Sequence, residues 1–148
     1  MINLNDYLSC GQNAIVQNTV KDTDASSKYI TPFRELLASP KLLHWAIDAS
    51  VDAIDPYLPE DYASIGTSIN FTHTAPTSVG MTVTVHVKIV EVTAQEVTLD
   101  IKAWDEQGEI GYGTHKRMIV QTDLVLATAK ERTKNISSRR ILNWAKNR

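Results

Sequence analysis

The sequence predicts an α+β domain in which one antiparallel sheet wraps around one long helix. One segment, residues 39–55, carries apolar residues at helical spacing, and four later segments alternate apolar and polar residues with a period of two. A length of 148 residues and a hydrophobic content of 43% suit a single domain with a sizeable core. One helix covers little more than one face of such a sheet. We therefore expect the remaining surface to join copies of the chain, in a homodimer or a dimer of dimers.

A strand and the long helix are the first elements expected along the chain. The β-branched segment QNAIVQNTV, residues 12–20, follows Gly11 and precedes a polar loop, which favours a strand. Ser39 is the expected N-cap of the helix, with Pro40 at its first position and Pro56 as its stop. Residues at three- and four-residue spacing give the helix a broad apolar face: Leu42, Leu43, Ala46, Ile47, Ser50, Ala53 and Ile54.

Four strands are expected after the helix. In IGTSINFTH, residues 65–73, strict alternation gives one face the side chains of Ile65, Thr67, Ile69, Phe71 and His73. Strands are also expected at residues 81–89 and 97–103, and a turn at Gly108 leads to the last strand, residues 110–120. The last strand places on one face Gly111, Gly113, His115 and Arg117. Glycines inside a strand indicate a bulge, or a close approach by a helix, backbone or ligand, so this face could floor a groove.

Charge divides the chain into two parts. Residues 1–129 hold 8 Lys and Arg against 16 Asp and Glu, whereas residues 130–148 hold 7 against 1. The first part is the expected folded domain and the second is a basic helical tail, reached through a short helix from Asp123 to about Lys134. The tail is either a solvated helix or a site for nucleic acid, an anionic membrane or a polyphosphate ligand. Because the body is acidic, no nucleic-acid partner is expected.

Cysteine and histidine usage narrows the compartment and the chemistry. Cys10 is the sole cysteine, so an internal disulfide is excluded and a reducing cytoplasm is favoured. No apolar run approaches the roughly 18 residues of a membrane span, so no membrane association is expected. The four histidines lack metal-ligand spacing, and neither a glycine-rich phosphate loop nor a dinucleotide fingerprint is present. We therefore expect no metal and no cofactor.

Two motifs resemble those of a known family. SIGTSINFTHTAPTSVGMTVTV, residues 64–85, and GEIGYGTHKRMIV, residues 108–120, resemble hot-dog fold thioesterases, in the branch similar to fluoroacetyl-CoA thioesterase. The resemblance spans roughly residues 12–124. It implies that residues 1–129 form a hot-dog domain, with a sheet wrapped around a central helix. It also implies a dimer with an acyl-CoA or related thioester at the subunit boundary.

The resemblance assigns roles to five positions. Matching the family residue by residue gives Ser39 and His73 as catalytic, and Gly66 and Arg117 as substrate-binding. The acidic position of the family carries Ile47 here, with Asp48 one place further on, so Asp48 is the candidate third catalytic residue. A shift of one residue rotates a helical side chain by about 100°, so the match at Asp48 requires a different helix start or a bulge.

Thioester hydrolysis needs a polarised carbonyl, a nucleophile and a route for the leaving thiolate. The first turn of the helix beyond Ser39 could hold the oxyanion through its free N–H groups, although Pro40 removes one of them. His73 could take a proton from Ser39 or from water, because an imidazole titrates near neutral pH. We favour attack by water, with Asp48 as the candidate group that orients the imidazole.

Each of these residues also has a purely structural interpretation. Ser39 could serve only as an N-cap, and His73 only as a hydrogen-bonded strand residue. Asp48 could pair with His44, four residues earlier on the helix. Arg117 could bind a CoA phosphate, bind the substrate or pair with an acidic neighbour. The sequence thus predicts an acyl-CoA thioesterase for small or medium acyl groups, with a non-catalytic acyl-CoA or small-ligand binding protein as the alternative.

Overall fold

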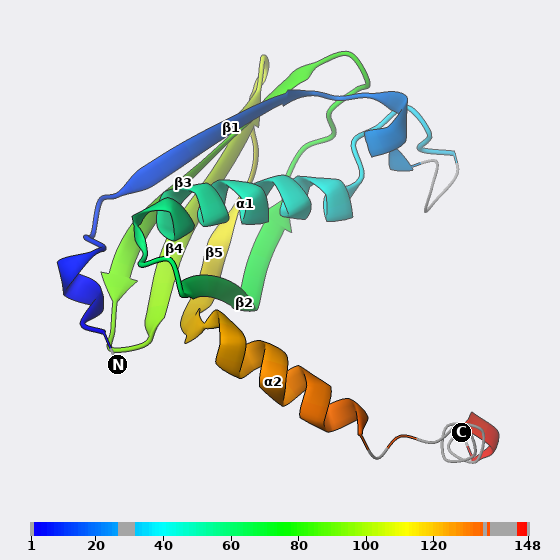
Figure 1. The fold of residues 1–148 in the computed structure, drawn as a ribbon. Coiled ribbons are helices and arrows are strands. Elements are labelled where there is room, and N and C mark those ends of the chain that lie inside the picture. The colour runs from blue at the N-terminus through cyan, green and yellow to red at the C-terminus, as the bar shows by residue number, and fades with distance from the viewer. Residues whose placement is uncertain (1, 27–31, 135, 137–144, 148) are drawn as a thin grey trace.

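A single helix, α1 (Ser39–Ile54), lies across the concave face of a five-stranded antiparallel sheet in the computed structural model (Figure 1). The structure describes residues 2–26, 32–134, 136 and 145–147. Strand order across the sheet is β1-β3-β4-β5-β2. The strands are β1 (Asn13–Thr19), β2 (Tyr62–His73), β3 (Thr82–Val92), β4 (Glu96–Asp105) and β5 (Gly108–Gln121). A second helix, α2 (Thr122–Thr133), follows β5, and single 3₁₀ turns occur at Leu4–Asp6, Asp22–Asp24 and Asp55–Tyr57. The expected α+β architecture is confirmed.

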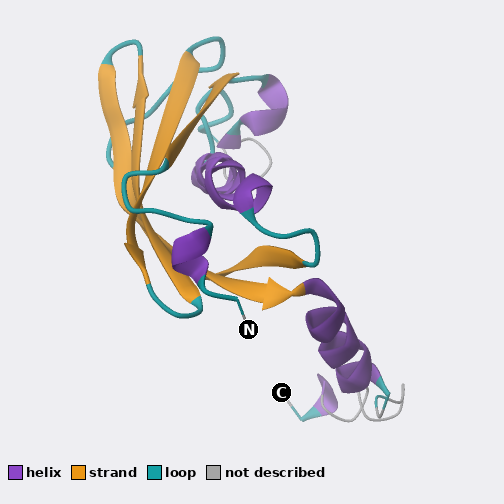
Figure 2. Ribbon diagram, turned by 60° about the vertical axis from the view of Figure 1, so that its left-hand side comes forward, coloured by secondary structure: helices purple, strands orange, loops and turns teal. Residues whose placement is uncertain are grey.

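The core forms between α1 and the central strands. The alternating residues expected to face inward on β3 and β4 are all buried: Val83, Val85, Val87, Ile89, Val97, Leu99, Ile101 and Ala103. The buried face of α1 is rotated from the expected one, because Trp45 and Ala49 join the core while Leu43 and Ile47 are only half-buried at its margin. Figure 2 shows that the helix covers only one face of the sheet. The opposite face is left to solvent or to another molecule.

Strict alternation along β2 was a wrong expectation. The pairing of β2 with β5 shifts register between Gly66 and Ser68, which marks a β-bulge. A bulge adds one residue to one strand and reverses the facing of the residues beyond it. Gly66 therefore shares the inward face with Ile69, Phe71 and His73, whereas Ile65 lies opposite Met118 on the outer face. His73 keeps its expected place on the apolar side.

The two inward glycines of β5 make room for the neighbouring strand. A Cβ on Gly113 would overlap the carbonyl oxygen of Asn70, and a Cβ on Gly111 would overlap the ring of Phe71. Close approach of backbone and side chain from β2 is therefore confirmed at both glycines, and the pairing of β5 with β4 also shifts register beside Gly111, as a bulge does. The face does not floor a groove at this point, because Phe71 fills the space over Gly111.

α2 stands away from the domain. It begins directly after β5 and contacts little besides that strand, and none of its residues is buried (Figure 1). Its N-cap is Gln121 rather than Asp123, and no side chain caps it. The helix crosses the expected boundary between residues 129 and 130, so its last turn belongs to the basic segment. Residues 135, 137–144 and 148 of the expected basic helical tail lie outside the described residues.

Candidate active site

Ser39 and His73 meet where α1 begins and β2 ends. The Ser39 Oγ atom lies 2.7 Å from Nδ1 of His73, within hydrogen-bond distance. Ser39 is the first residue of α1 and the N-cap position is held by Ala38, so the expected capping role of Ser39 is wrong. Its hydroxyl is directed to the imidazole instead. The structure therefore brings together the two residues that the sequence named as catalytic.

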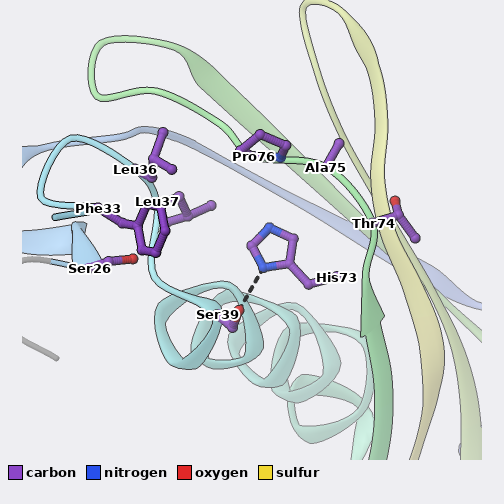
Figure 3. A pocket seen from close by; sticks show the side chains of 9 residues that line it. All are labelled: Ser26, Phe33, Leu36, Leu37, Ser39, His73, Thr74, Ala75 and Pro76. Carbon is purple, nitrogen blue, oxygen red and sulfur yellow. Dashed lines mark hydrogen bonds between the residues drawn. The ribbon is translucent and has the colours of Figure 1, made fainter. Parts of the chain in front are cut away.

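A cavity of about 350 Å³ opens beside this pair (Figure 3). Its wall is mostly apolar and consists of Ser26, Phe33, Leu36, Leu37, Ser39, His73, Thr74, Ala75 and Pro76. The segment before α1 is fixed in place by backbone hydrogen bonds from Ser26 to Leu36 and from Leu37 to Thr77, each 2.8 Å. Buried Thr77 in turn donates to the carboxylate of Asp105 at 2.8 Å. These hydrogen bonds hold the loops on both sides of the cavity in place.

The cavity wall contains residues that the sequence did not identify. Phe33, Leu36 and Leu37 precede the helix and were not assigned a role by periodicity, because they belong to neither a strand nor a helix pattern. In the sequence these three residues form a short apolar cluster just before the first turn of the long helix, and this cluster could have indicated them. Phe33 remains 53% exposed, a large apolar side chain at the mouth of the cavity (Figure 3). Such a side chain can cover an apolar ligand.

The surroundings of His73 favour the neutral form of its imidazole. Burial lowers the pKa of His73 from its ordinary value of 6.5, and the nearby backbone of Ala75 partly opposes this shift. Its Nε2 atom is buried and has no hydrogen-bond partner among the described residues. The ring is therefore an uncharged imidazole at neutral pH, with Nδ1 bonded to Ser39 and Nε2 buried.

The amino end of α1 offers fewer free donors than the sequence suggested. Pro40 has no N–H, and the N–H groups of Lys41 and Leu42 both donate to the carbonyl of Ala38, at 3.1 and 3.2 Å. The N–H of Ser39 has no acceptor among the described residues. The Ser39 N–H, supported by the helix dipole, is therefore the donor that this turn can direct at an oxyanion.

Asp48 does not orient His73 within the subunit. Its carboxylate lies 3.4 Å from Nε2 of His44, and its side chain is 54% exposed. The helix has no bulge that would bring Asp48 to the position of Ile47, because α1 is a continuous α-helix from Ser39. The structural interpretation, an exposed pair with His44, describes the contacts that Asp48 makes.

Gly66 and Arg117 form a separate polar cluster. The Arg117 guanidinium is buried and donates through Nε and Nη2 to the hydroxyl and carbonyl of Ser64, at 2.7 and 2.8 Å. The Ser64 hydroxyl donates to Asp55, and Nη1 of Arg117 lies 3.2 Å from Nε2 of His115. A Cβ on Gly66 would lie 3.2 Å from the His115 ring and 3.3 Å from Nη1 of Arg117. Neither Gly66 nor Arg117 lines the cavity within one subunit.

Burial governs the charges in this cluster. It lowers the pKa of Arg117, while Asp55 opposes that shift. His115 also has a lowered pKa, mainly because it is buried and less because of the positive charge on Arg117; its hydrogen bond to the carbonyl of Ser68, 2.7 Å long, opposes this. A neutral His115 can donate from Nδ1 to Ser68 and accept from Arg117 at Nε2. These bonds join β2, β5 and the end of α1, and they account for the contacts that Arg117 makes within the subunit.

Metal-ligand clusters and membrane-spanning helices are both missing from the described part of the chain. Among the described residues, no three His, Cys, Asp or Glu side chains gather so that they could hold a metal ion. No helix in the described ranges is long and apolar enough to cross a membrane.

Comparison with known proteins agrees with this geometry. Residues 19–123 match the family model of the fluoroacetyl-CoA-specific thioesterase. The fluoroacetyl-CoA thioesterase of Streptantibioticus cattleyicolor is 33% identical over 115 residues, which cover 78% of this chain and 83% of that protein.

Solved structures give the same fold. A hot-dog-like protein from Thermanaerovibrio acidaminovorans superposes with a TM-score of 0.86 at 25% identity, covering 91% of this chain and all of the other. A variant fluoroacetyl-CoA thioesterase in complex with acetyl-CoA superposes with a TM-score of 0.78 at 30% identity, covering 85% of this chain and 99% of that chain. The fold is therefore the hot-dog fold, and the chain belongs to the fluoroacetyl-CoA-specific thioesterase family.

Proposed function

We propose that the protein is an acyl-CoA thioesterase that hydrolyses small or medium acyl groups from CoA, with Ser39 and His73 at the reacting carbonyl. The observation that carries this proposal is the 2.7 Å contact between Ser39 Oγ and His73 Nδ1 beside an apolar cavity. Family membership supports the reaction class, and the acetyl-CoA complex of a relative supports the substrate class. Gly66 and Arg117 act indirectly, by holding β2 beside β5.

In the proposed reaction, water attacks the thioester carbon and transfers a proton to the neutral imidazole of His73. The carbonyl oxygen becomes an oxyanion that accepts a hydrogen bond from the Ser39 N–H at the amino end of α1. The intermediate collapses with cleavage of the carbon–sulfur bond. The CoA thiolate then receives the proton from His73, leaving a free carboxylic acid and CoA thiol. Ser39 Oγ orients the ring until the attacking water takes its place at Nδ1.

The size and lining of the cavity support a short acyl group. A volume of about 350 Å³ lies near the lower end of the roughly 300–1,000 Å³ range of ligand sites. The side chains of Phe33, Leu36 and Leu37 give an apolar surface for the acyl chain. A long-chain substrate would have to extend beyond this wall.

Assembly and compartment belong to the same proposal. β2 is an edge strand of 12 residues and β1, at the other edge, has 7, so β2 offers the longer unpaired edge. We propose a homodimer joined along β2. The exposed, free thiol of Cys10 suits a reducing compartment, which supports a cytoplasmic location.

One observation favours the alternative, a protein that binds acyl-CoA without turnover. No carboxylate among the described residues bonds to His73, and the position of the family acid carries Ile47. Purified protein should therefore be incubated with acetyl-, fluoroacetyl- and longer acyl-CoAs while free thiol and the thermal midpoint are measured. Thiol release with multiple turnovers is the expected result. Thermal stabilisation by a ligand without thiol release would support binding alone and contradict the thioesterase proposal.

A further inference from the structure

α2 exposes two large apolar side chains. Leu124 and Leu126 are 62% and 61% exposed, and the helix buries none of its residues. A helix of 12 residues is marginally stable in water without tertiary contacts. The match to the family model ends at residue 123, so most of α2 lies outside the matched residues. Leu124 and Leu126 are two residues apart and lie on different sides of the helix, and Leu124 borders a hollow that it forms with Ile2 and Tyr62 of the same subunit. Leu126 is therefore the side chain that would be covered by a surface outside the subunit.

The position of α2 indicates which surface that is. β5 ends at Gln121 opposite Tyr62, the first residue of β2, so α2 starts at the end of the sheet where β2 begins. In Figures 1 and 2, α2 leaves the sheet on the side of the β2 edge. A second copy paired antiparallel along β2 would place the start of its own β2 beside the end of this one. The end of β2 carries His73.

A two-fold dimer along β2 would therefore bring α2 of each subunit to the other subunit's cavity. The twelve residues of α2 extend about 18 Å, enough to pass beyond two or three strands spaced about 4.8 Å apart. Its apolar first turns would pack near the edge of the partner's sheet. Its last turn, which carries Lys130 and Arg132, would lie near the mouth of the partner's cavity.

Among the described residues, the cavity wall holds no cation for the phosphates of CoA, and exposed Arg34 follows Phe33 of the wall in the chain. CoA carries a diphosphate and a 3′-phosphate, yet no Lys or Arg is among the described residues that line the cavity. Lys41, in the first turn of α1, pairs with Asp24 at 3.6 Å. In α2, Lys134 pairs with Glu131 at 2.8 Å, whereas Lys130 and Arg132 are exposed and have no ion pair within the described part of the chain. The basic helix and the otherwise acidic body are complementary in charge.

We infer that α2 of one subunit completes the substrate site of the other, with Lys130 and Arg132 binding the phosphates of CoA across the dimer. This inference rests on the proposed thioesterase function and on the β2 dimer. It assigns the basic segment to a polyphosphate ligand. The other two ligands open to this segment, nucleic acid and an anionic membrane, would be favoured if the α2 variant described below left the KM for acyl-CoA unchanged.

The first test compares two substrates with the same acyl group. The double variant Lys130→Ala/Arg132→Ala should raise the KM for acyl-CoA about tenfold or more and leave kcat within about twofold. The KM for the corresponding acyl-pantetheine, which lacks these phosphates, should not change. The matched control Lys88→Ala/Lys102→Ala removes the same charge from exposed sites on the sheet and should leave both KM values unchanged. An unchanged KM for acyl-CoA in the α2 variant would overturn the inference.

The second test asks whether α2 acts across the dimer. A mixed dimer is made from one chain with His73→Ala and a second chain with Lys130→Ala/Arg132→Ala. Its one competent cavity belongs to the second chain and faces α2 of the first, so the KM for acyl-CoA should return to the wild-type value. A KM as high as that of the α2 variant, or a monomeric wild-type protein in analytical ultracentrifugation, would overturn the inference. A wild-type protein that hydrolyses neither substrate would contradict the proposed function instead.

Discussion

The hydroxyl of Ser39 and the imidazole of His73 restrict each other's chemistry. Nδ1 of His73 is bonded to Ser39, whereas Nε2 is buried and has no partner in the described part of the chain. If the neutral ring carries its proton on Nε2, Nδ1 can accept a hydrogen bond from the hydroxyl of Ser39. In that tautomer Nδ1 can act on Ser39 or on a water that replaces its hydrogen bond. Because Asp48 pairs with His44, the ring lacks the carboxylate that a serine nucleophile of a triad uses. Attack by water needs only the neutral base.

Replacing Ser39 with Ala separates these two routes. We expect kcat to fall about tenfold, the effect of one lost orienting hydrogen bond, because His73 remains as the base. Steady-state thiol release measures kcat, and intact-mass spectrometry of the wild-type enzyme during turnover should show no acyl adduct. An acyl group on Ser39, or complete loss of activity in the Ala variant, would instead identify Ser39 as the nucleophile.

The pH profile reports the protonation state of His73. Burial lowers the pKa of His73 below its ordinary value of 6.5, and a general base works only in its neutral form. We expect kcat/KM to stay level near neutrality and to fall only below pH 6.5, as His73 gains a proton. The profile should be measured with a substrate that does not titrate in this range. An acid limb centred above pH 6.5 would show that another group controls the reaction.

Asp48 can be tested against a second carboxylate on the same helix. The Asp48 side chain is exposed and bonded to His44, so Asp48→Asn should leave kcat within about twofold of wild type. Asp52→Asn, which changes another exposed carboxylate on the same helix stripe, is the matched control. A tenfold or larger decrease in Asp48→Asn alone would restore a catalytic role for this residue.

At the scale of helices and strands, hydrophobic periodicity predicted the features that depend only on the residues of one segment. The long helix, the inward faces of β3 and β4, and the turn at Gly108 follow from spacing that each segment carries by itself. The β-bulge at Gly66 did not follow, because it depends on which residues of β5 lie opposite. The cavity wall at Phe33 did not follow either, since an irregular segment has no period. The Ser39–His73 pair came from family resemblance rather than from spacing.

The close approach of β2 to β5 makes a specific prediction for Gly113. A Cβ there would overlap the Asn70 carbonyl oxygen, so Gly113→Ala must displace β2. We expect a loss of about 2–3 kcal/mol in the free energy of unfolding. Urea denaturation gives the value, and Thr114→Ala, at an exposed neighbouring position of the same strand, should cost less than about 1 kcal/mol. Equal effects of the two substitutions would mean that the strand adjusts freely.

For the molecule as a whole, the Ser39–His73 pair lies at one end of the sheet and α2 at the other. A single subunit therefore has a cavity for the acyl group but no described cation at that cavity for the CoA phosphates. Antiparallel pairing of two subunits along β2 would remove this separation. The proposed dimer would then explain three features together: the unpaired edge of β2, the exposed helix α2, and the basic last turn of α2.

The most direct measurement of the proposed chemistry is thiol release from acyl-CoA by the folded His73→Ala variant. We expect its kcat to fall by about 10² or more while its circular dichroism and thermal midpoint stay close to wild type, because the variant loses the base. His44→Ala, which removes an exposed histidine outside the cavity, should retain wild-type turnover. Unchanged turnover per folded His73→Ala molecule would contradict the assignment of His73 as the base, and with it the active site at the start of α1.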